Sequence, residues 1–363
     1  MTDPLAAWRT SVDSRISRTL ESTIAATSEA GAEVSEITEP MLDAAAGGKR
    51  LRALLLLASH AAHAPETAEG PGHEAAIDVA AALELFQTAA LLHDDVLDDS
   101  DTRRGKPAAH RRIARVHGER GWLGSALSFG AAGGILAGDL TLMACQRALV
   151  RATAVLGTTR ASTVAEMFVD MSDLVTAGQY MDMRAAAQPI DALDRQHDQI
   201  IGVMRSKTAS YTCEFPLALG AAIAGADGAQ VATMREVGLD LGIAFQLRDD
   251  LLGLHGAPEV TGKPTGDDIR EGKRTLVLWR AWTQTDEIGK EAIRDTLGVR
   301  DASTDQVSRV LEVIAATDAE QWCEAHIDLR ATRARATLDG ASLHPEGAAV
   351  IDELIGHSVT RSH

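Results

Sequence analysis

Aromatic side chains are scarce in this chain, since Phe, Trp and Tyr together make up only 3% of its 363 residues. Alanine and aliphatic residues fill the apolar positions instead, and alanine is the best helix former. Residues 77–99 and 234–254 carry apolar side chains at intervals of three and four over stretches too long for strands. Small side chains also let helices approach one another closely. We therefore predict an all-α fold, a bundle of about ten helices.

Cysteine and proline are also few. The three cysteines, Cys145, Cys213 and Cys323, are odd in number and far apart, which argues against both a disulfide framework and a zinc site. A reducing, cytoplasmic location is expected. The 10 prolines are scattered and no linker divides the chain. We therefore expect one domain over residues 1–363, with its motifs between residues 47 and 275.

Long hydrophobic runs are absent as well. The N-terminal residues lack an apolar signal core, and the small-apolar stretch over 129–150 is interrupted by Asp139, Gln146 and Arg147. We expect no transmembrane segment.

Positive charge is in deficit, with a formal net charge of −17. Nucleic-acid binding depends mainly on clustered Lys and Arg, so we expect no nucleic-acid partner, and any phosphate site must be local.

Carboxylates, by contrast, are concentrated in the stretch HDDVLDDSDTRRG over 93–105. Asp94 and Asp98 lie four residues apart, so on a helix they share one face, while Asp95 is turned by about 100°. Two oxygen ligands one turn apart suit Mg²⁺, which keeps several waters and is commonly completed by substrate phosphates. A solvated acidic helix end is the alternative for this motif taken alone.

A second acidic pair, Asp249 and Asp250, ends the apolar segment 245–250, and the glycine-rich loop 260–275 follows it. This loop interleaves lysines and aspartates, among them Lys263, Asp267, Lys273 and Arg274. Such a loop suits a diphosphate carried on metal, because glycine permits tight backbone turns. An exposed charged loop is the alternative.

Basic and neutral polar residues form three shorter motifs. GGKRLR over 47–52 places Lys49 and Arg52 near a helix start, where they suit phosphate oxygens, although a basic helix terminus is the alternative. GQYMD over 178–182 and SKTASYT over 206–212 place Gln179 and Thr208 on helical faces. For these two, a satisfied internal hydrogen bond is the ordinary explanation.

Together these motifs resemble the trans-isoprenyl diphosphate synthases of the polyprenyl synthetase family, over most of the chain and in the family's order. The resemblance implies an all-α fold around a deep central cavity, with two aspartate-rich motifs facing each other across its mouth, and a homodimer. It implies that Asp94 and Asp98 hold two Mg²⁺ ions and Asp249 a third, about three per active site. Asp267 would assist through water.

The resemblance also assigns the two substrates. The diphosphate of an allylic substrate would bind to Arg103, Lys207 and Lys263. Isopentenyl diphosphate would bind opposite, on Lys49, Arg52, Arg104 and Gln87. The residues lining the space between the substrates would be Gln179, Thr208 and Gln246. The reaction would ionise the allylic carbon–oxygen bond, add the double bond of isopentenyl diphosphate and lose a proton to the departing diphosphate.

One position departs from the family's pattern. Gly253 stands where many members have a third aspartate in the second motif. Since one carboxylate with waters can hold Mg²⁺, we expect weaker metal or diphosphate affinity at most. We further expect Gly253→Asp to be tolerated.

Product length is predicted from the residues that precede the first motif. Ala90 and Ala89 are small, and Phe86 is the first large ring, about 12 Å along the helix from Asp94. If Phe86 helps to form the floor under the growing chain, the product is geranylgeranyl diphosphate, with farnesyl or longer polyprenyl diphosphates as alternatives. Phe86 as ordinary core is the other interpretation. Less favoured functions are a terpene cyclase, a non-catalytic synthase subunit and a helical scaffold.

Overall fold

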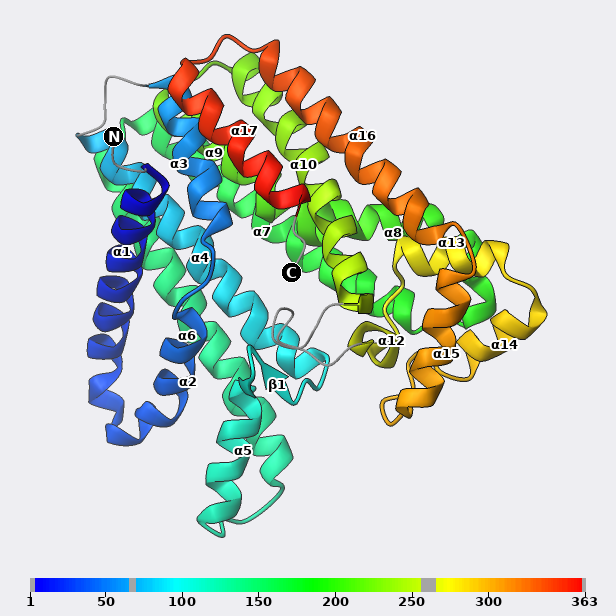
Figure 1. Ribbon diagram of the computed structural model, residues 1–363. Helices are drawn as coiled ribbons and strands as arrows, with labels where there is room; N and C mark the ends of the chain where they lie inside the picture. The colour runs from blue at the N-terminus through cyan, green and yellow to red at the C-terminus, as the bar shows by residue number, and fades with distance from the viewer. Residues whose placement is uncertain (1–3, 65–69, 256–265, 361–363) are drawn as a thin grey trace. The chain divides into compact units, whose positions relative to one another are not determined.

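The computed structural model describes residues 4–64, 70–255 and 266–360 (Figure 1). Most of them are helical, and within these residues the strands are limited to β1 (Thr102–Arg103) and β2 (Lys106–Pro107). The predicted all-α fold is confirmed. The chain forms two compact units, Met1–Glu166 with Leu219–Ala226, and Met167–Ala218 with Asp227–His363. We describe each unit by itself.

The first unit is built around the long helix α4 (Pro71–Leu97). This helix contacts α1, α2, α3, α5 and α6. The other elements of the unit are α1 (Pro4–Thr27), η1 (Ser28–Ala30), η2 (Ala32–Val34), α2 (Ser35–Ala45), α3 (Leu51–His63), the hairpin β1–β2, α5 (Ala109–Glu119), α6 (Ala126–Val155) and the start of α7 (Thr158–Ala186).

Glycines of α6 allow α4 and α5 to pack closely against it. A Cβ atom at Gly138 would lie 2.2 Å from Nε2 of His93 on α4, and one at Gly130 would lie 2.3 Å from the carbonyl oxygen of His110 on α5. No real Cβ packs at such distances. His93 also lies with Nε2 3.1 Å from the carbonyl oxygen of Ile135. These contacts fix the end of α4 that carries the first acidic motif.

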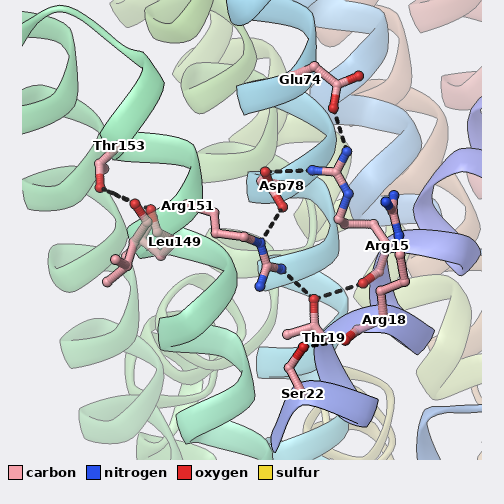
Figure 2. A network of polar contacts seen from close by, with 10 residues as sticks. Arg15, Arg18, Thr19, Ser22, Glu74, Asp78, Leu149, Arg151 and Thr153 are labelled. Atoms are coloured by element: carbon pink, nitrogen blue, oxygen red, sulfur yellow. Dashed lines mark hydrogen bonds and ion pairs between the residues drawn. The ribbon is translucent and has the colours of Figure 1, made fainter.

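A buried polar network joins α1 to α4 and α6 (Figure 2). Arg15 lies 2.5 Å from Asp78, and it also donates to Glu74 at 2.5 Å. The second oxygen of Asp78 accepts from Nε of Arg151 at 3.2 Å, and Arg151 donates to the hydroxyl of Thr19. Asp78 is buried, so its charge requires these two arginines. The network therefore holds the N-terminal helix in place.

The second unit is centred on α10 (Gly228–His255), which contacts η4, α16 and α17. Arg248 on α10 donates to both carboxylate oxygens of Glu324 on α16, at 2.5 and 2.6 Å, and to the carbonyl oxygen of Val359 on α17 at 2.9 Å. A bidentate arginine contact of this kind fixes orientation as well as distance. The other elements include the end of α7, η3 (Ile190–Arg195), α8 (His197–Val203), the π-helix η4 (Met204–Glu214), α9 (Phe215–Ala224), whose last residues belong to the first unit, and α12 (Asp267–Glu271).

Five more helices complete the described part of this unit. They are α13 (Leu276–Gln284), α14 (Glu287–Arg294), α15 (Thr304–Ala315), α16 (Ala319–Asp339) and α17 (Pro345–Val359). Three of them, α13, α14 and α15, are short, with 9, 8 and 12 residues. The described residues therefore hold more helices than the ten or so expected. Side chains of Thr275, Asp286 and Ser303 accept hydrogen bonds at the starts of α13, α14 and α15. Each cap satisfies a backbone N–H that is free at the start of a helix.

Two helices are long and apolar enough to cross a membrane by length and composition alone. The most apolar stretch of α4 is 83% buried and that of α6 is 33% buried. α4 is thus a core helix. α6 leaves large apolar side chains exposed, namely Leu127, Phe129, Ile135, Leu136, Met143, Val150 and Val155.

Candidate active site

The first acidic motif lies at the C-terminal end of α4. Asp94 is in the last turn and Asp98 caps the helix, with its N–H donating to the carbonyl oxygen of Asp94 at 2.8 Å. Both side chains are half-buried. A helix C-terminus carries partial negative charge, so carboxylates there are unfavourable unless a cation accompanies them. The local electrostatics therefore favour a bound cation.

Asp95, the middle residue of this motif, holds Arg103. Its side chain is buried and accepts from Nε of Arg103 at 2.8 Å and from a second guanidinium nitrogen. The same guanidinium lies 3.9 Å from Asp94. The structure thus brings a predicted diphosphate ligand to the predicted metal ligands. Sequence reasoning assigned no role to Asp95, although its different direction on the helix was evident.

The hairpin turn gives Arg104 a different partner from that of Arg103. Arg104 and Gly105 both have positive φ, 52° and 73°, as a two-residue hairpin turn between β1 and β2 requires. Arg104 donates to the carbonyl oxygen of Ala46 at 2.9 Å, beside the glycines of GGKRLR. Desolvation lowers the pKa of Arg104, and the charges of Arg50 and Arg103 lower it further.

Other predicted isopentenyl diphosphate ligands lie in the same unit. Lys49 is exposed in the turn before α3, and Arg52 is half-buried in the first turn of α3. Gln87 is half-buried two turns before Asp94 on α4, and its Oε1 atom is buried with no hydrogen-bond partner among the described residues. Such an oxygen is costly unless a ligand or water satisfies it.

α4 also carries the predicted chain-length residues. Gln87, Ala90, Asp94 and Asp98 are all half-buried and recur every three or four residues, so they form one accessible strip. Phe86 is 8% exposed and Ala89 is fully buried. Whether these residues determine product length stays a prediction.

The second unit holds Lys207, Thr208 and Gln179. Lys207 donates to Asp182 of GQYMD, with Nζ 2.6 Å from Oδ2, and both side chains are about four-fifths shielded, at 23% and 21% exposure. Lys207 and Thr208 lie in the π-helix η4, and wide helical turns are frequent at functional sites. A Cβ atom at Gly178 would lie 2.6 Å from the backbone nitrogen of Lys207, so glycine permits the close packing of α7 on η4.

The second acidic motif lies in the last two turns of α10. Asp249 is half-buried, and Asp250 is buried and accepts from Nε2 of Gln246 at 2.6 Å. Burial raises the pKa of Asp250 to about 8, and the neighbouring carboxylates Asp268 and Asp249 raise it too, against the hydrogen bond from Gln246. Gln246, predicted to line the space between the substrates, thus donates to Asp250.

Gly253 lies against Asp268. A Cβ atom at Gly253 would lie 2.5 Å from Oδ2 of Asp268, while Oδ1 of Asp268 accepts from Lys273 at 2.8 Å. The expectation that Gly253→Asp is tolerated is therefore opposed by the structure, because a new carboxylate would meet one already held there. Asp268 is thus the carboxylate beside Gly253. Lys263 lies outside the described residues.

Carboxylates suitable for a metal are present in both units. No three His, Cys, Asp or Glu side chains within residues 4–64, 70–255 and 266–360 come together as a ready-made site. Mg²⁺ does not need one, since it is often held by one or two carboxylates with waters and substrate phosphates. Asp94 and Asp98 supply such a pair. The facing of this pair and Asp249, which belong to different units, stays a prediction.

The chain is similar to known proteins over most of its length. The polyprenyl synthetase family model matches residues 34–314. The chain is 33% identical to the geranylgeranyl diphosphate synthase of Saccharolobus solfataricus over 74% of this chain and 73% of that protein. It is 32% identical to the geranylfarnesyl diphosphate synthase of Aeropyrum pernix over 87% of this chain and 91% of that protein.

A solved structure extends the likeness to the fold. The geranylgeranyl pyrophosphate synthase of Corynebacterium glutamicum, crystallised with isoprenyl diphosphate and magnesium, matches with a TM-score of 0.89 and 34% identity. The match covers 97% of this chain and 98% of that one. The chain therefore belongs to the polyprenyl synthetase family, the trans-isoprenyl diphosphate synthases, which are metal-dependent trans-prenyltransferases.

Proposed function

We propose that this protein condenses isopentenyl diphosphate with allylic diphosphates, depends on Mg²⁺, and releases geranylgeranyl diphosphate as its main product. The observation that carries this proposal is the grouping of Asp94, Asp98 and Arg103, in which carboxylates for a metal adjoin a guanidinium for a phosphate. The relatives named as geranylgeranyl diphosphate synthases support it.

The allylic diphosphate has one set of ligands. Mg²⁺ bound by Asp94, Asp98 and Asp249 would supply positive charge next to the diphosphate oxygens. Arg103 is held in place by Asp95 and Lys207 by Asp182, so both cations are oriented before substrate binds. Oriented charges of this kind stabilise the negative charge that develops on a leaving diphosphate. Lys263 completes the proposed set.

Isopentenyl diphosphate has a second set, made up of Lys49, Arg52, Arg104 and Gln87. Arg104 reaches the GGKRLR turn through Ala46. The amide N–H of Gln87 would donate to a diphosphate oxygen. Gln179, Thr208 and Gln246 would lie between the two substrates. The departing diphosphate would take the proton that the product loses, so no protein nucleophile is required.

The product grows along the accessible strip of α4 in this proposal. Ala90 leaves room below Asp94, and Phe86 lies one turn further along the helix. A tail that passes Ala90 and stops near Phe86 has medium length, with farnesyl diphosphate as the second candidate.

The proposed assembly is a cytoplasmic homodimer. α6 exposes seven large apolar side chains, and Leu127 and Val150 are 63% and 65% exposed. Apolar surface of this extent is typical of protein interfaces. A second copy of the chain would bury it.

The proposal is tested by supplying purified protein with isopentenyl diphosphate and a radiolabelled allylic diphosphate, with and without Mg²⁺. We expect diphosphate release only when both substrates and Mg²⁺ are present, and a geranylgeranyl product by chromatography. Diphosphate release from the allylic substrate alone, with a cyclic hydrocarbon product, would instead indicate a terpene cyclase. Lack of turnover would indicate a non-catalytic subunit.

A further inference from the structure

We infer that Arg50 and Glu84 form a buried pair of positioning residues that shapes the isopentenyl diphosphate site. The inference rests on the proposed function of Lys49 and Arg52, which flank Arg50 in GGKRLR. Neither Arg50 nor Glu84 needs to touch the substrate, because both side chains point into the first unit, with 6% exposure each.

Arg50 holds the turn that precedes α3. Its backbone is left-handed, with φ 57° and ψ 33°, a conformation that residues other than glycine rarely adopt. The side chain has three partners: Nε donates to Asp13 on α1 at 2.7 Å, Nη2 donates to the carbonyl oxygen of Ala45 at 2.9 Å, and Nη1 lies 3.6 Å from Glu84. These contacts stabilise a backbone conformation that is unfavourable by itself.

Glu84 holds the start of α3 from a different helix. No side chain caps the N-terminus of α3 locally, since Arg50 occupies the cap position. Instead, Oε1 of Glu84 on α4 accepts from the backbone N–H of Ala53 at 3.2 Å, and Oε2 faces Arg50. A carboxylate at a helix N-terminus satisfies a free N–H and interacts favourably with the helix dipole.

The phosphate-binding side chains lie between these anchors. Lys49 directly precedes Arg50, and Arg52 directly precedes Ala53, so the backbone on each side of the pair is fixed. Arg50 and Arg104 bind consecutive carbonyl oxygens, those of Ala45 and Ala46. The buried pair therefore sets the positions of three proposed cationic ligands at once.

Glu84→Gln tests this inference, because it removes the charge and keeps an acceptor for Ala53. We expect the KM for isopentenyl diphosphate to rise about tenfold. A change of this size is typical when one partner of a buried charged contact is removed. The KM for the allylic substrate should change by less than about twofold. Calorimetric binding of isopentenyl diphosphate without metal should weaken by the same factor. Equal rises in both KM values, or no rise in either, would overturn the inference.

Two further variants keep the test decisive. If Glu84→Gln fails to fold, Arg50→Lys is measured in the same way; it keeps the charge but loses the fork that contacts three partners, so the same selective rise is expected. Asp13→Asn is the matched control, since Asp13 also contacts Arg50 but is 48% exposed. Its effect on either KM should stay below about twofold.

Lys49→Ala separates this inference from the proposed function. If Lys49→Ala leaves the KM for isopentenyl diphosphate unchanged, the proposed site itself is wrong. If Lys49→Ala raises that KM while folded Glu84→Gln and Arg50→Lys do not, the site is right and the positioning role is wrong.

Discussion

Lys207 and Asp182 form a short ion pair, with Nζ 2.6 Å from Oδ2, although Lys207 is a proposed diphosphate ligand. The ion pair restricts the flexible side chain of Lys207 to one orientation before the substrate binds. We expect Asp182→Asn to raise the KM for the allylic diphosphate about tenfold, because Lys207 loses its anchor. Steady-state kinetics with both substrates varied would measure this.

Two variants control for a general effect at α7. Asp182→Glu keeps the charge and should retain most of the affinity. Asp173→Asn removes an exposed carboxylate from the same helix and should leave both KM values unchanged. A similar loss in Asp173→Asn would show that charge on α7, rather than the ion pair, is responsible.

Gly253→Asp should destabilise the protein. The new Cβ would lie 2.5 Å from Asp268, and the added carboxylate would repel the one that Lys273 holds. We expect the free energy of unfolding to fall by about 1–3 kcal/mol, as overpacking commonly costs. Gly253→Ala adds the same Cβ without charge and should cost less. Wild-type stability of Gly253→Asp in denaturant titrations would contradict the close packing seen here.

Acid should destabilise the protein through His60. Burial lowers the pKa of His60 to about 4, helped by the nearby His73 and His63. The unfolded chain binds this proton below about pH 6.5 and the folded chain only below about pH 4, so protonation favours unfolding between these values. The free energy of unfolding should therefore fall as the pH drops from about 6.5 to about 4, by roughly 3 kcal/mol in all.

His60→Gln should reduce this dependence, which denaturant titrations at several pH values would measure. His357→Gln, at an exposed histidine, should leave it unchanged. An identical acid dependence in His60→Gln would assign the effect to other groups.

Product length should respond to the strip on α4. Ala90→Phe places a ring one turn from Asp94 and should shorten the product. Ala89 is fully buried, so Ala89→Phe should shorten the product only if the helix tolerates the larger side chain. Phe86→Ala should lengthen it. Chromatography of the products would measure this, and an unchanged distribution in Phe86→Ala would place the floor on another helix.

The helices and the first motif could be predicted from sequence because they depend on local periodicity. Asp94 and Asp98 lie one turn apart on any helix, and the apolar pattern of α4 predicts the helix itself. The role of Asp95 could not be predicted in this way, because it depends on the hairpin that returns Arg103 to α4.

Contacts between segments that are far apart in the sequence could not be predicted either. Glu84 caps α3 from 31 residues away, and Asp182 meets Lys207 across 25 residues. In the sequence, Gly253 stands where many family members have an aspartate. In the fold, the side chain of Asp268 occupies the space beside Gly253. The π-helical form of η4 depends on backbone hydrogen bonds that composition does not reveal.

The most direct test of the central claim is the turnover of Asp94→Ala and Asp98→Ala at limiting Mg²⁺, with circular dichroism to verify folding. Loss of a carboxylate ligand should cost several kcal/mol of transition-state stabilisation. We expect at least about a hundredfold loss of kcat/KM in each variant, with helix content unchanged. Near-normal turnover in either folded variant would contradict the proposal that these two carboxylates hold the metal.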